Sequence, residues 1–338
     1  MKRLLKVLVA LLVLAGLAVG GGVFWLNGLA NEAVGPKDAP EFELVVSKGM
    51  TGRSLGPVLL SKGLIGNALG WRWFLWRRGA LNPKAGKHLV SPKLTPAQLA
   101  EVLEAPPRVE DQAFIVVEGW RLRDTDKALV EKGLCKPGAY VRAAGNPAHF
   151  HATFPLPTTT LEGYLYPETY RFPVGPVDVD ALIQRQLDMF GERFVTAHKA
   201  ELDASKRTLD QVVIMASMLE REEPTPGNRT IVSGILWKRF DRGTPLGVDA
   251  TSRYLLEEWN DKKAFLARLR DADDPWNSRT RAGLPPGPLG AATLESLLAA
   301  AHPETNEYWY YLHDANKKLH PSRNAAEHEA LRAQFNVY

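Results

Sequence analysis

Residues 208–223, TLDQVVIMASMLEREE, predict the helix around which the rest of the body is organised. Thr208 and Gln211 stand three residues apart in the form of a capping box, which starts a helix. Every residue from 212 to 219 except Ser217 is apolar. A helix that is apolar on all sides has to be covered by protein, so we expect it to be central and buried.

Glu220 stands at the carboxy-terminal end of this helix and continues its apolar stripe, seven residues after Val213 and four after Ala216. That end is negative in the helix macrodipole, and Glu222 and Glu223 add two more acids. Burial, the dipole and neighbouring acids all favour a protonated carboxyl group. General-acid cleavage of a glycosidic bond requires such a group. The alternative is a solvated helix end, where the intervening arginine pairs with the acids.

A second acidic segment, residues 161–172, reads LEGYLYPETYRF and combines Glu162 and Glu168 with three tyrosines and a phenylalanine. Aromatic faces stack on the apolar faces of sugars, and carboxylates accept hydrogen bonds from hydroxyl groups. The segment therefore fits a carbohydrate site. An aromatic-rich strand and turn in the core is the alternative interpretation.

The amino-terminal segment predicts a membrane anchor. Residues 7–26 contain no charge, and a helix of this length spans the hydrocarbon core of a bilayer. Trp25 suits the membrane interface. Lys2, Arg3 and Lys6 precede the run. The positive-inside rule therefore predicts that residues 1–6 stay in the cytoplasm, that residues 7–26 cross the cytoplasmic (inner) membrane, and that the rest of the chain is exported. A cleaved signal peptide is the alternative.

Composition and charge exclude several classes of protein. The 338 residues are 45% hydrophobic and 24% charged, as in globular proteins of about two domains. The net charge is +4, of which the first six residues supply +3, so the nearly neutral remainder disfavours nucleic-acid binding. A single cysteine, Cys135, excludes an intramolecular disulfide and a cysteine-based zinc site. His149 and His151 have the spacing of a metal pair, but nearby prolines favour an exposed loop.

A strand, a glycine turn and a helix occur in the same order twice. Residues 42–49, FELVVSKG, and residues 113–119, AFIVVEG, each predict a strand that ends in a glycine turn. Gly63 and Gly133 close the helices that follow, 14 residues after the first glycine in each copy. The pattern predicts one strand–helix module present twice, although two copies with few identities leave chance open.

Loop residues divide the chain into segments. Residues 27–41 are small, polar and proline-containing, which indicates a tether. Residues 105–107, APP, follow the helix that a capping box at Thr95 begins and mark a domain boundary. Beyond residue 175 the chain is expected to be mostly helical. The expected helices are 178–194, 208–223, 229–242, 250–259, 294–301 and 325–336, with caps at Thr208, Asn228, Asp249 and Thr293 and a closing Gly243.

Three motifs in order resemble one known family. LEGYLYPETYRF at 161–172, ASMLERE at 216–222 and GLPPGP at 283–288 follow an amino-terminal anchor. This arrangement resembles the endolytic murein transglycosylase family (MltG, YceG-like) over nearly the whole chain. The resemblance implies an α+β fold: a transmembrane helix, a small LysM-like β/α subdomain at 42–106 and a larger mixed domain at 107–338 that ends in a mostly helical catalytic part.

The resemblance also assigns site residues. Glu220 matches the family's catalytic acid, Glu222 the second acid of that motif, and Glu162 the acid of the L-E-G motif. A usual Y-N-T-Y segment is partly kept as WNSR at 276–279. The other supporting or substrate-binding matches are Tyr164, Tyr166 and Asn277, and the departures from the family pattern are Ser278, Arg279, Ala291 and Ala292.

The implied activity is lytic cleavage of peptidoglycan. Glu220 would protonate the oxygen of the MurNAc–GlcNAc β-1,4 bond, and the 6-hydroxyl of the same MurNAc would attack, leaving a 1,6-anhydro-MurNAc end. No metal or organic cofactor is needed. The implied partners are glycan strands, the membrane through residues 7–26, and peptidoglycan synthases. A water-using muramidase-type hydrolase and a non-catalytic peptidoglycan-binding scaffold are the alternatives.

Overall fold

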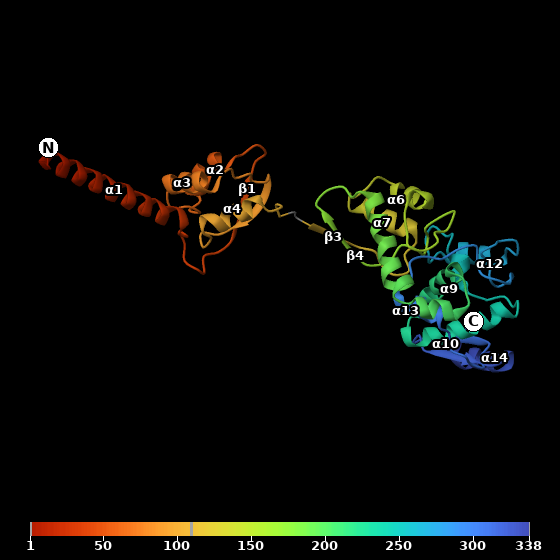
Figure 1. Ribbon diagram of the computed structural model, residues 1–338. Coiled ribbons are helices and arrows are strands. Elements are labelled where there is room, and N and C mark those ends of the chain that lie inside the picture. Colours follow the sequence, from red (N-terminus) through yellow and green to blue (C-terminus); the bar gives the residue numbers. More distant parts are fainter. Residues whose placement is uncertain (1, 109–110, 338) are drawn as a thin grey trace. The chain divides into compact units, whose positions relative to one another are not determined.

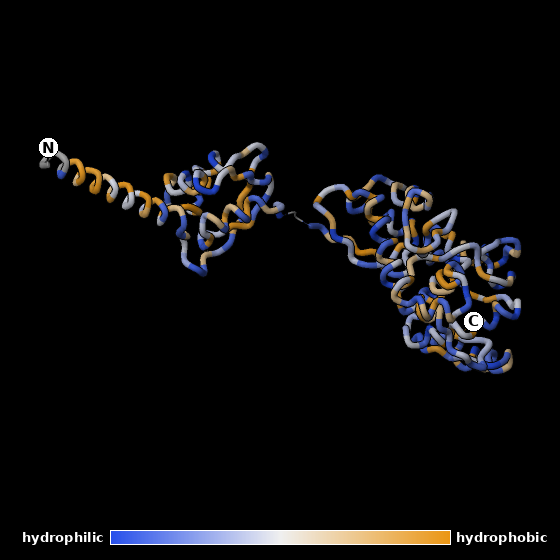
Figure 2. Tube along the Cα trace, in the orientation of Figure 1, coloured by the Kyte–Doolittle hydropathy of each residue, from blue (hydrophilic) through white to orange (hydrophobic). Residues whose placement is uncertain are grey.

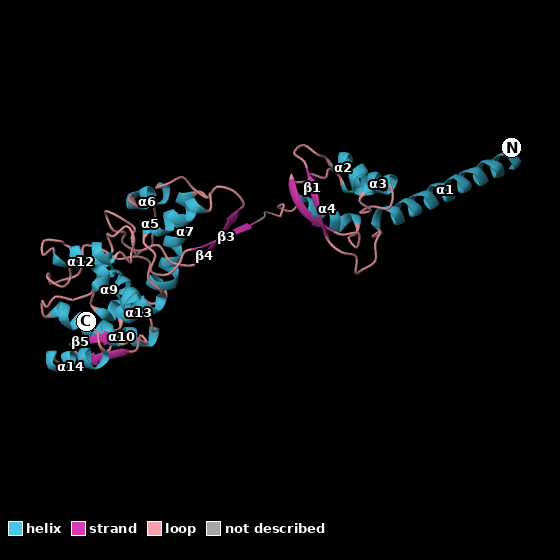
Figure 3. Ribbon diagram, turned by 180° about the vertical axis from the view of Figure 1, so that it is seen from behind, coloured by secondary structure: helices cyan, strands magenta, loops and turns pink. Residues whose placement is uncertain are grey.

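The computed structural model describes residues 2–108 and 111–337. The chain divides into two compact units, Met1–Glu110 (unit 1) and Asp111–Tyr338 (unit 2). Each unit encloses its own hydrophobic core. Figure 3 shows helices with small two-stranded sheets in both units, which confirms the expected α+β class.

Helix α1, Lys2–Asn31, opens unit 1. Among the described residues, its Leu8–Asn31 part is the one helix long and apolar enough to cross a membrane. Its side chains from 8 to 25, where the structure describes them, are exposed on all sides, and Figure 2 shows this stretch as mostly hydrophobic. Burial begins only at Leu26. An apolar stretch of helix that no protein covers suits a single-pass membrane anchor.

The rest of unit 1 is a two-stranded antiparallel sheet with three helices (Figure 1). Capping boxes begin two of these helices, at Thr51 and, as expected from the sequence, at Thr95. Leu59 and Leu99 are fully buried in the core, and Trp71 nearly so. The elements are β1 (Phe42–Val46), α2 (Gly52–Ser61), α3 (Ala68–Arg78), β2 (Gly86–Val90) and α4 (Pro96–Glu104).

Unit 2 begins with a second two-stranded antiparallel sheet, formed by β3 and β4, and a group of helices. Phe114 and Tyr170, which face each other across that sheet, are both 1% exposed, so the sheet contributes directly to the core. The elements are β3 (Asp111–Ile115), α5 (Leu122–Glu131), α6 (Ala139–Ala144), η1 (Pro147–His149), β4 (Thr169–Pro173), α7 (Val179–Phe190), η2 (Gly191–Thr196) and α8 (Lys199–Ser205).

The carboxy-terminal part of unit 2 is built around α9, Leu209–Glu222. Thr208 and Gln211 form the expected capping box, and all residues from Val212 to Leu219 are buried, which confirms the central helix. It packs against α10, α11 and α13. The elements that follow are η3 (Pro226–Asn228), α10 (Arg229–Asp241), α11 (Asp249–Arg253), α12 (Lys262–Arg270), α13 (Leu294–Ala301), β5 (Tyr310–His313), β6 (Leu319–Ser322) and α14 (Ala325–Phe335).

The repeated module is present in the structure. Helix α5 lies 70 residues after α2 at both of its ends. Gly49 and Gly119 have positive φ angles of 86° and 73°, and Gly63 and Gly133 have 66° and 68°. After each closing glycine, the next leucine N–H donates to the carbonyl five residues back at 2.9 Å. The two copies therefore share their turns as well as their order.

The expected helix 250–259 is wrong in extent, because α11 ends at Arg253. Arg121 Nη1 donates to the carbonyl oxygens of Tyr254 and Leu256, at 3.0 and 2.6 Å, and so binds acceptors that a longer helix would use. Two expected caps differ from the sequence argument. Asn228 stands at the N-cap position of α10 but makes no side-chain capping bond. Asp249 is wrong as a cap, because it lies inside α11, after the N-cap at Val248.

Candidate functional site

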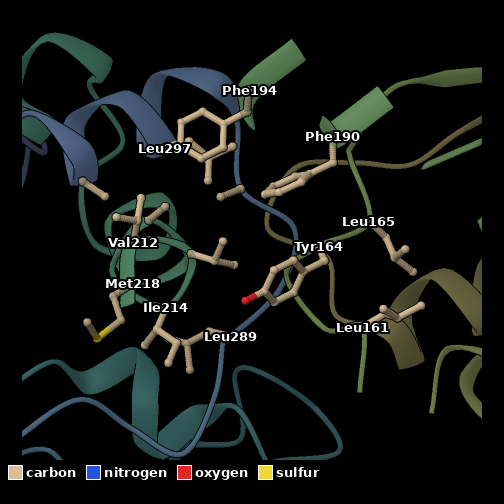
Figure 4. Close-up of a cluster of buried hydrophobic side chains, with 14 of the residues drawn as sticks. Leu161, Tyr164, Leu165, Phe190, Phe194, Val212, Ile214, Met218, Leu289 and Leu297 are labelled. Carbon is tan, nitrogen blue, oxygen red and sulfur yellow. The ribbon is translucent and has the colours of Figure 1, made fainter. Parts of the chain in front are cut away.

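The three sequence motifs meet around α9. The Leu289 N–H, just after the GLPPGP segment, donates to Ser217 Oγ on α9 at 2.9 Å. Gly163 of the L-E-G segment has φ of 80°, and a Cβ there would lie 2.4 Å from Pro288 Cβ. Figure 4 shows Tyr164, Leu289 and side chains of α9 in one buried cluster. Residues more than 100 positions apart in the chain thus form one junction.

Glu220 is nearly buried at this junction, with 8% of its side chain exposed. Its Oε1 accepts a hydrogen bond from Arg229 Nη2 at 3.0 Å. Its Oε2 accepts from the Thr293 N–H at 2.8 Å and from Thr293 Oγ1 at 2.6 Å. Both carboxyl oxygens are therefore engaged as acceptors. The sequence argument for a protonated Glu220 considered burial, the helix dipole and the neighbouring acids. It did not include the three donors that Arg229 and Thr293 supply.

Arg229 joins the end of α9 to the starts of two other helices. It lies at the first position of α10 and is itself buried. Its Nε donates to the Glu223 carbonyl oxygen at 3.1 Å, and its Nη1 donates to Thr293 Oγ1 at 2.8 Å. Thr293 is the N-cap of α13, as expected. One guanidinium group thus holds Glu220 and the caps of two helices in a fixed geometry.

Glu162 is a second buried carboxyl group, 4% exposed. Both of its oxygens accept from the Leu122 N–H at 3.2 Å, and Oε2 accepts from the Tyr254 hydroxyl at 3.0 Å. Burial raises the pKa of Glu162 to about 7, although the bonds from Leu122 and Tyr254 act to lower it. This carboxyl group therefore exchanges its proton near neutral pH.

Glu222 and Glu223 point to partners different from those of Glu220. Glu222 accepts from the Ala250 N–H and from the Tyr311 hydroxyl, both at 3.3 Å, and burial raises its pKa. Glu223 is 0% exposed and contacts His313 Nε2 at 2.9 Å. The end of α9 is consequently not a solvated charged end, because each of its acids has its own buried surroundings.

Arg221 does not pair with these acids. Its Nη2 donates to the Gly119 carbonyl oxygen, and its guanidinium group lies 4.0 Å from the centre of the Trp259 ring. Gly119 in turn donates its N–H to the Ala291 carbonyl oxygen at 2.6 Å. The turn of the second strand–helix module is therefore tied to both α9 and the segment that leads into α13.

A pocket of about 300 Å³ opens beside Thr293. Tyr166, which is half-buried, lines it together with three acids, Glu118, Glu168 and Glu295. Thr293 belongs both to this pocket and to the contacts of Glu220. The pocket therefore offers an aromatic ring and several hydrogen-bond acceptors next to the junction that holds Glu220.

Tyr164 and Asn277 support the fold around the site instead of facing the pocket. Tyr164 is 2% exposed and donates from its hydroxyl to Asp210 Oδ1 at 3.0 Å, so its ring has no open face for a sugar. Asn277 is 0% exposed, and its amide donates to the carbonyl oxygens of Leu269 and Asp271 at 3.1 and 2.9 Å. These contacts fix the start of α9 and the loop after α12.

The β5–β6 hairpin contributes site residues that the sequence argument missed. Tyr311 and His313 of β5 contact Glu222 and Glu223. Residues 308–313, YWYYLH, are rich in aromatic side chains that favour strands, and this signal could have indicated β5. Arg229 and Tyr254 were also missed, since neither belongs to a recognisable motif.

Within residues 2–108 and 111–337, no group of three or more His, Cys, Asp or Glu side chains is placed to hold a metal ion. His149 is exposed and contacts Asp180 at 3.3 Å. His151 lies in the loop after η1, where its N–H donates to Gln184 Oε1 at 3.1 Å.

The fold resembles that of a solved bacterial protein. It resembles the crystal structure of a yceG-like protein from Listeria monocytogenes with a TM-score of 0.57, at 22% sequence identity, covering 87% of this chain and all of that one. A family model described as the YceG-like family matches residues 44–334. The chain belongs to the YceG-like family.

The curated proteins to which this chain is similar are named endolytic murein transglycosylase. An endolytic murein transglycosylase of Bacillus subtilis is 27% identical over 175 residues, which are 52% of this chain and 48% of the relative. An endolytic murein transglycosylase of Streptococcus pneumoniae serotype 2 is 24% identical over 179 residues, or 50% of this chain and 32% of the relative. The alignment thus spans about half the length of the first relative and a third of the second.

Proposed function

We propose that this protein is a membrane-anchored endolytic peptidoglycan lytic transglycosylase with Glu220 as its general acid and base. The observation that carries the proposal is the place of Glu220, at the end of a buried helix, where three motif segments meet beside the Tyr166 pocket. Membership of the YceG-like family and the name of the curated relatives support the same activity.

In the proposed reaction, the MurNAc–GlcNAc oxygen binds on the Thr293 side of Glu220. Glu220, which is the carboxylate of an ion pair with Arg229, first takes up a proton from solvent. It then gives this proton to that oxygen while the bond to the MurNAc anomeric carbon breaks. The 6-hydroxyl of the same MurNAc attacks the oxocarbenium-like carbon and gives its proton to the Glu220 carboxylate. The products are a free GlcNAc hydroxyl and a 1,6-anhydro-MurNAc end, and Glu220 regains its proton. An intramolecular nucleophile has a high effective concentration, so no second catalytic carboxylate is required.

Thr293 is the group through which substrate would reach the acid. In the structure its hydroxyl donates to Glu220 Oε2 and accepts from Arg229 Nη1. A hydroxyl can rotate and both donate and accept, whereas the backbone N–H and the guanidinium group can only donate. Rotation of this hydroxyl would free one of the two hydrogen-bonding positions on Glu220 Oε2, from which a proton can pass to the glycosidic oxygen. The Thr293 N–H and the ion pair with Arg229 would stay in place.

The remaining acids have supporting roles in the proposal. Glu162 holds the Leu122 N–H and the Tyr254 hydroxyl, and so fixes the start of α5 near the junction. Glu222 holds Tyr311 of the hairpin. Tyr166 provides the ring on which a sugar stacks, and the pocket acids accept hydrogen bonds from sugar hydroxyls.

The other parts of the chain complete the proposed enzyme. Residues 7–26 anchor it in the cytoplasmic membrane with the amino terminus inside. Residues 42–106 are a LysM-like subdomain that holds glycan, and residues 107–338 form the exported catalytic domain. Such an enzyme would act beside peptidoglycan synthases on nascent strands. It needs no metal and no organic cofactor.

A water-using hydrolase is the competing activity, and the products separate the two. We would digest purified sacculi with the full-length protein and identify the new glycan ends by mass spectrometry. Anhydro-MurNAc ends support the proposal, whereas reducing MurNAc ends show hydrolysis and contradict it. Glu220→Gln should release neither, and Glu131→Gln, an exposed acid at the end of α5, should behave as wild type. Retention of glycan without cleavage by the wild-type protein would indicate a scaffold.

A further inference from the structure

Helix α3 presents apolar side chains on two opposite faces. Trp71 and Phe74 are buried in the core of unit 1, with ring centres 5.3 Å apart. On the other face Leu69 is 53% exposed and Trp76 is 73% exposed. Trp73 stacks on Trp76 with ring centres 4.8 Å apart. Leu69, Trp73 and Trp76 follow the i, i+4, i+7 spacing, so they form one stripe, exposed at Leu69 and Trp76 and half-buried at Trp73, which we call the α3 face.

The α3 face is fixed to the base of helix α1. Trp73 Nε1 and Arg77 Nη1 both donate to Asn27 Oδ1, at 3.0 and 2.6 Å. A Cβ on Gly70 would lie 2.5 Å from the Leu29 carbonyl oxygen, so the two backbones are in close contact. This contact requires glycine, and it sets α3 at a definite height along α1.

That height is the point where α1 stops being exposed. The described side chains of α1 are exposed up to Trp25, and burial by unit 1 begins at Leu26. With a rise of about 1.5 Å per residue, Asn27 lies only about 3 Å along the axis from Trp25. If the exposed stretch is in lipid, the α3 face is therefore held at the level of the lipid headgroups.

A hollow of about 870 Å³ lies between the base of α1, the start of α2 and the helix α3. Leu26, Trp73 and Trp76 line it on the apolar side, and Arg53 and Arg72 on the charged side. Among the described residues that line it, none is acidic. Tryptophan beside arginine is the combination that favours a membrane interface, where rings lie among headgroups and cations meet phosphates.

We propose that the α3 face rests on the surface of an anionic phospholipid bilayer, with Trp73, Trp76 and Leu69 in the interface and Arg53 and Arg72 at headgroup phosphates. The inference rests on the proposed anchoring by α1 and goes beyond it. It makes unit 1 a membrane-seated body instead of one that swings on a tether. A second copy of the chain is a less suitable partner for this face, because Arg53 and Arg72 of the two copies would repel each other.

The test uses the full chain in vesicles and single labelling sites in a Cys135→Ala background. A fluorescent NBD label is placed at Leu69→Cys on the α3 face, at Leu60→Cys on α2 as a matched exposed control, and at Leu14→Cys within α1. Leu60 is 42% exposed and lies outside the α3 face. Aqueous iodide and a lipid-borne nitroxide quench the label in phosphatidylcholine vesicles with or without phosphatidylglycerol.

We expect the label at 69 to be protected from iodide and quenched by the nitroxide lipid, more strongly when phosphatidylglycerol is present. The label at 60 should stay open to iodide. Trp76→Ser and Arg72→Ser should each lower the lipid quenching at 69 and leave that at 14 unchanged.

Three results would overturn the inference. If the label at 69 is as open to iodide as that at 60 while 14 is quenched by lipid, the anchor stands and the docking fails. If 14 is also open to iodide, the anchor fails and the docking with it. Protection at 69 without lipid quenching would mean that protein, such as a second copy, covers the face.

Discussion

Arg229 and Glu220 form an ion pair in which the guanidinium and carboxyl side chains are only 6% and 8% exposed, with Nη2 and Oε1 3.0 Å apart. Burying two charges is costly, and such a pair rarely adds net stability over an apolar pair. Its value here is geometric, because it holds the proposed acid in one rotamer beside Thr293. The pair also makes each partner sensitive to removal of the other.

Glu220→Gln should reduce the release of anhydro-MurNAc ends by about 10²–10⁴-fold, because an amide has no transferable proton. The amide still accepts from Thr293 but leaves Arg229 without its anion, so we expect a loss of about 1–3 kcal/mol in the free energy of unfolding. Mass spectrometry of digested sacculi and urea unfolding measure the two effects. Near-normal cleavage by Glu220→Gln, with none by Glu222→Gln, would move the acid to Glu222.

Arg229→Gln should cost more stability than Glu220→Gln, about 3–5 kcal/mol. It leaves the Glu220 carboxylate without its cation, and it also removes the bonds of the guanidinium group to the Glu223 carbonyl oxygen and to Thr293 Oγ1. The double variant should be more stable than the sum of the single effects predicts. Urea unfolding of the four proteins completes a double-mutant cycle. Additivity within about 0.5 kcal/mol would show that the two side chains are not coupled.

The stability of the protein should depend on pH through Glu162. Its folded pKa of about 7 lies above that of an unfolded glutamate, so the folded state binds more protons between about pH 4.5 and pH 7. Its contribution is present below this window and is lost as the pH rises through it, on the order of 3 kcal/mol. The free energy of unfolding of Glu162→Gln, measured relative to that of wild type, should therefore be higher at pH 8 than at pH 5.

Urea unfolding at both pH values measures this difference. Glu131→Gln, with the same change of charge at an exposed position, should follow the pH dependence of wild type. A pH trend in Glu162→Gln equal to that of wild type would rule out this carboxyl group as the source. In activity assays, Glu162→Gln should lower turnover and keep the anhydro product, and a switch to reducing ends would count against a supporting role.

Gly163→Ala should destabilise unit 2 by two separable effects. Its φ of 80° disfavours alanine by about 1 kcal/mol, and its Cβ would lie 2.4 Å from Pro288 Cβ. Gly283→Ala is the matched control, since Gly283 has φ of 93° with nothing within 4 Å of an added Cβ. We expect thermal unfolding to show an additional loss of about 1–3 kcal/mol for Gly163→Ala. Equal losses would mean that the L-E-G and GLPPGP segments can separate freely.

The anchor predicts a defined topology. A reporter that is active only outside the cytoplasm, fused after Tyr338, should be active, because three cations precede the apolar run. A reporter that needs the cytoplasm should be inactive at the same fusion point. The opposite pattern would reverse the orientation. Replacing Lys2, Arg3 and Lys6 with glutamine should weaken the bias.

Local patterns in the sequence predict much of this fold. The capping box at Thr208 and the apolar run after it define α9 almost to the residue, because both signals depend on neighbours within one helical turn. The repeated module is predictable for the same reason, since the closing glycines need positive φ wherever they occur.

Long-range partners could not be predicted in this way. Nothing in the composition of α10 shows that Arg229 reaches Glu220, because that contact depends on how two helices cross. Arg121 likewise ends α11 from more than 100 residues away, against the local helical preference. His313 depends on a hairpin whose register is set only by pairing. The protonation argument for Glu220 failed to include its donors for the same reason.

The duplicated turn leaves the two modules with unequal tolerance to substitution. Gly49 and Gly119 occupy the same place in the two modules, yet an added Cβ at Gly49 meets nothing within 4 Å, while at Gly119 it meets Arg221. Both glycines have positive φ, so a side chain is strained at either turn. At the second turn α9 must also make room for it, whereas at the first turn only the backbone conformation limits it.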